Sequence, residues 1–134
     1  METSWRSRLE PWPVALFCAI TLFIWTNRIW LAWTNDEDTV AEKLVWSTPI
    51  TLFVIAAAVL AVTMLRTRAG ERPAAFATGV KVFAAGTVAY WGIRFPMIAL
   101  ADHDVGFKVV HGVLAAVSVA AAVGAWRSVP SSRP

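Results

Sequence analysis

Long runs of apolar residues alternate with short polar segments along this chain of 134 residues. A helix needs roughly 20 mostly apolar residues to cross the hydrocarbon core of a bilayer. Four runs reach that length, over residues 13–33, 44–65, 74–100 and 105–126. The pattern therefore predicts an all-α fold, a polytopic membrane protein whose single domain is a four-helix transmembrane bundle.

The composition agrees with a chain that lies mostly within lipid. Charged residues make up 16% of the chain, whereas soluble domains carry roughly 25%. A net charge of +3 could indicate binding to nucleic acid. However, the basic residues stand at the ends of the apolar runs and form no basic stripe. We therefore expect the lipid bilayer as partner, together with other integral membrane proteins or copies of this chain, and no nucleic acid.

The sign of the charge alternates from one connecting segment to the next. Acidic residues dominate segments 34–43 and 101–104, and arginines dominate the N-terminal segment, segment 66–73 and the C-terminal tail. Because cytoplasmic loops carry the excess of Lys and Arg, each segment gives the same orientation. The sequence predicts a multi-pass protein of the cell membrane, with both termini in the cytoplasm and the acidic loops outside.

A layer of basic side chains occurs at similar depth in three of the four runs. Counted at about 1.5 Å per residue from the outer ends, its members lie in the outer third of the membrane. They are Arg28, Arg94, Lys108 and His111. The adjoining loops carry acidic residues, among them Asp36, Asp38, Asp102 and Asp104.

Two interpretations of this layer remain open. In the first, the cations extend to the interface and form ion pairs with the loop carboxylates, which ties the outer ends of the helices together. In the second, they converge on a water-filled pocket for an anion, a phosphate or a lipid headgroup, since intramembrane charge is typical of functional sites. Lys81, near the other end of its run, is expected to extend toward the cytoplasmic headgroups.

Small residues repeat every fourth position along the last run. They are Gly112, Ala116, Ala120 and Gly124. Such a repeat lets transmembrane helices approach closely. It predicts a packing face, which either another helix of this chain or a separate protein would cover.

No motif in the sequence indicates catalysis or a cofactor. We find no phosphate-binding Gly-rich loop, no metal-ligand spacing and no Ser, His and acid arrangement, and the only cysteine, Cys18, lies inside an apolar run. The leading hypothesis is a small accessory subunit of a larger transport or respiratory membrane complex. The alternatives are a homo-oligomeric transporter or channel that uses the basic layer, and an enzyme acting on lipid headgroups.

Overall fold

The computed structural model describes residue 8 and residues 11–34, 39–67 and 69–130, and their regular secondary structure is helical throughout. The elements are α2 (Trp12–Thr34), α3 (Val40–Arg66), the short 3-10 helix η1 (Ala69–Glu71), α4 (Ala74–Leu100) and α5 (Val105–Ser128). The four α-helices are each long and apolar enough to cross a membrane. They confirm the helical class and the prediction of four helices of membrane-spanning length, and they identify a candidate multi-pass membrane protein.

The one clear difference in boundaries is the start of α3, which begins at Val40 rather than at residue 44. Thr39 caps the helix, since its hydroxyl oxygen accepts a hydrogen bond from the Glu42 amide at 3.2 Å. The same hydroxyl donates to the Glu42 carboxylate at 3.2 Å. Capping lets a helix begin in a polar sequence, so an apolar-run criterion places the start too late.

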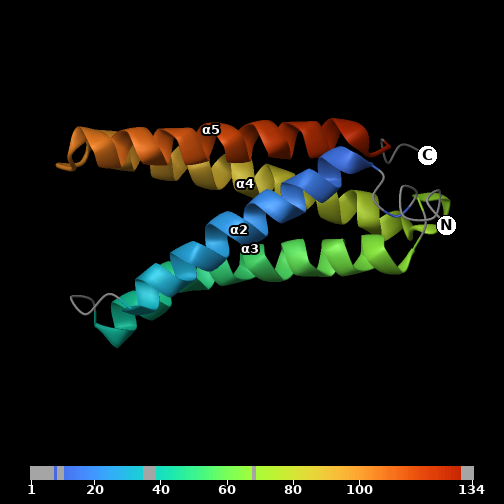
Figure 1. Ribbon diagram of the computed structural model, residues 1–134, viewed down its shortest axis with the longest axis horizontal. Coiled ribbons are helices and arrows are strands. Elements are labelled where there is room, and N and C mark those ends of the chain that lie inside the picture. The colour runs from blue at the N-terminus through green and yellow to red at the C-terminus, as the bar shows by residue number, and fades with distance from the viewer. Residues whose placement is uncertain (1–7, 9–10, 35–38, 68, 131–134) are drawn as a thin grey trace.

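The helices form two antiparallel hairpins, α2–α3 and α4–α5 (Figure 1). α2 packs on both α3 and α5, α4 packs on α5, and the contact between α3 and α4 is much smaller. α2 begins and α5 ends at the same end of the molecule as η1, and from there the hairpins diverge toward the opposite end (Figure 1). We call the former the arginine end, after Arg8, Arg66, Arg72 and Arg127, and the latter the aspartate end, after Asp102 and Asp104.

Aromatic side chains join the hairpins in the middle of the bundle. The Trp25 ring stacks on Trp91 at 5.3 Å and on Phe53 at 5.9 Å, and it meets Tyr90 edge-on at 5.2 Å. Aromatic pairs of this kind contribute about 0.5–1.5 kcal/mol each beyond their buried area. They connect α2, α3 and α4, where the direct contact between α3 and α4 is small.

The face that α5 turns to the core differs from the face that carries its small-residue repeat. Its buried residues follow a spacing of four and three: His111, Ala115, Ser118, Ala122 and Ala125. Ala116 and Ala120 are exposed. Gly112 lies against Phe95 of α4, and Gly124 lies near Pro13 at the start of α2. The bundle therefore covers the two ends of the repeat and leaves its middle open.

Candidate functional site at the aspartate end

Three helices bring Arg28, Arg94 and His111 to one level of the bundle. Arg94 precedes Ala101 by seven residues and His111 follows Asp104 by seven, so the antiparallel hairpin sets them side by side. The charges of Arg28 and Arg94 act on each other and on His111. Both guanidinium groups also act on the Tyr90 hydroxyl. These four side chains, from α2, α4 and α5, form what we call the basic cluster.

The His111 ring is buried and is held in place by two contacts with Phe107 of the same helix. It is only 3% exposed, and its ring stacks on Phe107 with the centroids 4.0 Å apart. Its Nδ1 lies 2.8 Å from the Phe107 carbonyl oxygen. A carbonyl oxygen can only accept, so Nδ1 carries the proton and Nε2 of the neutral ring is an acceptor. Nε2 is buried and has no hydrogen-bond partner among the described residues.

Buried polar atoms continue inward from the basic cluster along α4. Thr87, Trp91 and Arg94 share one face of this helix because they are spaced by four and three. Thr87 and Trp91 are 2% and 3% exposed, and within the described part of the chain neither Thr87 Oγ1 nor Trp91 Nε1 has a hydrogen-bond partner. Ser118 lies at the level of Thr87 by the same residue count and is also buried. Buried polar groups thus continue from the cluster to mid-bundle, among apolar and aromatic side chains.

The sequence interpretation missed the inner members of this polar line. Thr87, Tyr90 and Trp91 carry no formal charge at neutral pH, so the pattern of charged positions within the apolar runs does not include them. A signal was nevertheless present, since positions 87, 91 and 94 follow helical spacing on one face. Tertiary structure was needed to show that this face turns inward.

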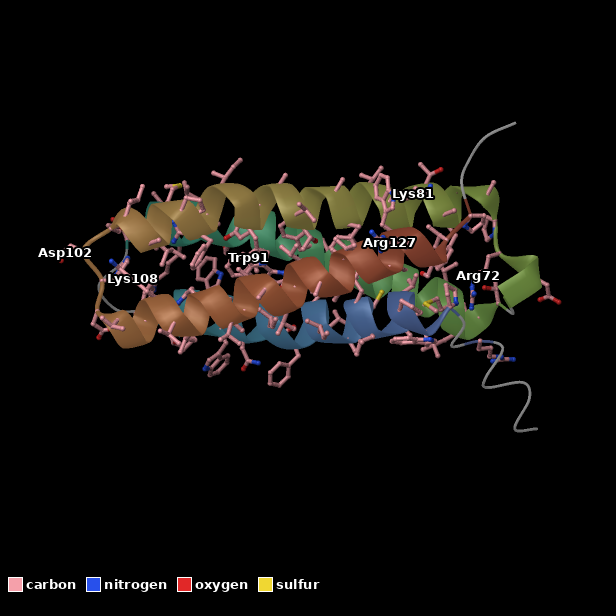
Figure 2. The ribbon with its side chains drawn as sticks, turned by 90° about the horizontal axis from the view of Figure 1, so that it is seen from above. Arg72, Lys81, Trp91, Asp102, Lys108 and Arg127 are labelled. Atoms are coloured by element: carbon pink, nitrogen blue, oxygen red, sulfur yellow. The ribbon has the colours of Figure 1, made fainter. Side chains whose placement is uncertain are left out.

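The remaining predicted residues take separate positions. Lys108 is half-buried, one turn before His111 on α5, and Figure 2 shows it at the aspartate end together with Asp102. Asp102 is exposed. The Asp104 carboxylate accepts a hydrogen bond from the Phe107 amide at 2.7 Å and so caps α5. Asp36 and Asp38 lie outside the described residues, so ion pairing by that loop stays a prediction.

For Arg28, the charged and polar groups that act on the guanidinium can be named. Among the described residues, the groups whose charge acts on it are Tyr90 and Arg94, and neither is a carboxylate. A guanidinium within a membrane span is costly unless it is paired or hydrated. Arg28 therefore stands in a basic environment within the described part of the bundle.

No protein-family model, curated protein or solved structure matches this chain.

Proposed function

We propose that this protein binds a small inorganic anion in the membrane, as the recognition site of a transporter or channel that opens at the aspartate end. The observation that carries the proposal is the convergence of Arg28, Arg94 and His111 from three different helices. Cationic side chains brought together inside a low-dielectric bundle raise its positive potential, and that potential attracts an anion.

The chemistry of the cluster suits an oxyanion such as sulfate. Guanidinium groups present several N–H donors in a fixed plane, which matches the oxygens of sulfate or phosphate. The buried line of Trp91 Nε1 and Thr87 Oγ1 offers further hydrogen-bonding groups deeper in the bundle. Burial of such groups without partners costs about 1–3 kcal/mol each, and an anion that accepts their hydrogen bonds offsets part of that cost.

His111 couples anion binding to proton uptake in this proposal. With Nδ1 bonded to the Phe107 carbonyl, neutral His111 presents the lone pair of Nε2, which repels an anion. Protonation turns Nε2 into an N–H donor. A bound anion stabilises the imidazolium, so by linkage the affinity rises as the pH falls through the range in which histidine titrates.

The first test measures whether sulfate stabilises the purified protein. A ligand present at about 100 times its dissociation constant stabilises the folded state by about 2.7 kcal/mol. We expect sulfate to raise the unfolding temperature of the wild type, and Arg28→Gln to weaken binding about 10- to 100-fold through loss of charge-assisted hydrogen bonds. Arg66→Gln, an exposed arginine at the other end, is the matched control and should bind as the wild type does. Equal loss in both variants would refute the site.

The second test uses pH, with sulfate as the probe because its charge is constant between about pH 5 and 8. The wild type should bind more tightly at the acid end of this range, and His111→Phe should bind with no such dependence. His103→Phe is the control, since this exposed ring also stacks on Phe107. An unchanged pH dependence in His111→Phe would remove histidine from the mechanism.

Sulfate and chloride flux into liposomes then separates transport from binding. Flux by the wild type that Arg28→Gln abolishes would support a transporter or channel. Binding without flux would favour a sensing or regulatory role for the same site.

An accessory subunit is the second candidate function. It is favoured by the exposure of Ala116 and Ala120, which leaves a part of α5 where another transmembrane helix can approach closely. The predicted consequence is stoichiometric copurification with a defined membrane partner in mild detergent, measured by native mass analysis. Elution of this chain by itself, or as copies of itself, would count against the subunit function.

A further inference from the structure

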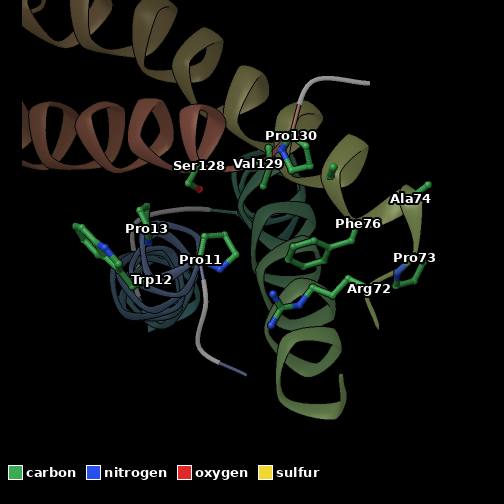
Figure 3. A pocket seen from close by; sticks show the side chains of 11 residues that line it. Pro11, Trp12, Pro13, Arg72, Pro73, Ala74, Phe76, Ser128, Val129 and Pro130 are labelled. Atoms are coloured by element: carbon green, nitrogen blue, oxygen red, sulfur yellow. The ribbon is translucent and has the colours of Figure 1, made fainter. Parts of the chain in front are cut away.

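A pocket of about 620 Å³ opens at the arginine end, where α2 begins, α4 begins and α5 ends. Its walls are residues 11–13, residues 72–74 with Phe76 and Ala77, and residues 128–130. Figure 3 shows Arg72 and Phe76 on the wall opposite Trp12. The pocket lies at the opposite end of the bundle from the basic cluster and shares no residue with it.

The Arg72 guanidinium is fixed in the wall of this pocket. Its Nη2 donates a hydrogen bond to the Arg8 carbonyl oxygen at 2.6 Å. Its Cζ lies 5.2 Å from the centre of the Phe76 ring, which is a cation–π distance. Since a fixed guanidinium loses less entropy when it binds an oxyanion, Arg72 is preorganised for a phosphate.

The first turn of α4 adds positive potential to the same pocket. Pro73 is the N-cap residue of this helix of 27 residues, and no side chain caps it. Pro73, Ala74, Phe76 and Ala77 of this helix start line the pocket, so the positive end of the helix dipole lies at its wall. Arg72 and the helix end are two separate sources of positive potential, one from a side chain and one from the backbone.

The rest of the pocket suits the apolar part of an amphiphile. Its lining is mostly apolar, and Trp12, 67% exposed, stands at its edge as tryptophans do at membrane interfaces. Pro11, Pro13, Pro73 and Pro130 line it and restrict its backbone. The other described charges at this end are mainly the arginines that define it, which attract anionic lipids.

We infer that this pocket binds the phosphate headgroup of an anionic phospholipid. The phosphate lies against Arg72 and the first turn of α4, and the acyl chains leave past Trp12 into the bilayer. Basic pockets between transmembrane helices on the cytoplasmic side are typical headgroup sites. The predicted orientation of the chain puts the arginine end on that side.

The test compares two glutamates in the same turn of α4. Ala74→Glu puts a carboxylate in the pocket wall, and Ala75→Glu puts one on a neighbouring position that does not line the pocket. Both positions are exposed, and both substitutions favour the helix because acidic residues stabilise a first turn. The full-length protein is mixed with equal amounts of phosphatidylglycerol and phosphatidylcholine, and bound lipid is counted by native mass spectrometry.

We expect the wild type and Ala75→Glu to retain phosphatidylglycerol over phosphatidylcholine. Ala74→Glu should lower the amount of retained phosphatidylglycerol at least about tenfold, because like charges at close range cost several kcal/mol. Arg72→Gln should lose the same preference, and millimolar inorganic phosphate should leave the lipid bound. Circular dichroism of each variant checks that the helices are intact.

Three results would overturn the inference. Equal retention of the two lipids by the wild type would show no headgroup selection. Equal losses of bound phosphatidylglycerol in Ala74→Glu and Ala75→Glu would show that the lipid responds to the total charge of this end and not to the pocket. Displacement of the lipid by inorganic phosphate would show that the pocket binds a soluble phosphate and not a lipid headgroup.

Discussion

At the scale of single residues, the same type of side chain serves different purposes according to where it stands. Asp102 and Asp104 are two residues apart in one short loop, yet only Asp104 accepts a hydrogen bond from the first turn of α5. Lys81 lies within a span, and its ammonium stands 5.2 Å from the centre of the Trp126 ring. The sequence identifies these groups as ionisable but leaves their partners open, because partners depend on packing.

The two aspartates give a matched test at this scale. Asp104→Ala should destabilise the protein by about 0.5–2 kcal/mol because it removes the N-cap of α5. Asp104→Asn should restore most of that loss, since its amide oxygen can accept the same bond. Asp102→Ala should change stability by no more than about 0.5 kcal/mol. Unfolding by denaturant in mixed micelles measures all three, and equal costs at positions 102 and 104 would contradict the capping assignment.

At the scale of elements, the geometry of the α-helix explains why some small residues of α5 contact neighbouring helices and others are exposed. Four residues turn a helix by about 400°, which is about 40° more than one full turn. A repeat of four therefore drifts around the helix, from Gly112 against α4, across exposed Ala116 and Ala120, to Gly124 near α2. The repeat was expected to form one packing face, and it forms two short contacts with an open stretch between them.

Substitutions along this repeat should separate folding from assembly. A Cβ at Gly112 would lie 3.3 Å from the Phe95 ring, so Gly112→Leu should destabilise the α4–α5 hairpin by about 1–3 kcal/mol. Ala116→Leu points away from the core and should leave the unfolding midpoint unchanged while it weakens copurification with a partner. Thermal unfolding and native mass analysis give the two readouts. A stability loss in Ala116→Leu would place this residue in the core instead.

At the scale of the whole molecule, charge and shape divide the bundle into two unlike ends. Arg72 and Arg127 lie toward one end and Asp102 at the other, with Trp91 between them (Figure 2). The hairpins diverge toward the aspartate end (Figure 1). The anion-binding and lipid-binding proposals therefore concern opposite ends and can fail independently.

The orientation of these ends in the membrane can be tested by cysteine labelling. The only native cysteine, Cys18, is buried, so Cys18→Ser gives a background without a reactive thiol. In that background, Asp102→Cys should react with an impermeant maleimide on intact cells because the positive-inside rule predicts this loop outside. Gly70→Cys should react only after the cells are opened. The opposite pattern would reverse the topology and the leaflet proposed for the lipid.

The sequence by itself determined the properties that depend on local pattern. The length and hydropathy of each run set four helices, because a chain in lipid must satisfy its backbone hydrogen bonds within each segment. The charges between the runs set the predicted orientation in the same local way. The boundaries were close except at α3, where the cap at Thr39 preceded the apolar run.

Only the tertiary structure decided which side chains meet. Arg28 is distant in the sequence from Arg94 and His111, and their proximity follows from the packing of α2 on α5 of the other hairpin. The inward face of α4 that carries Thr87 and Trp91, and the pocket where three helix ends meet, were equally hidden. The physical reason is that lipid-facing and core-facing residues are both apolar in a membrane, so hydropathy alone cannot distinguish the faces of a helix.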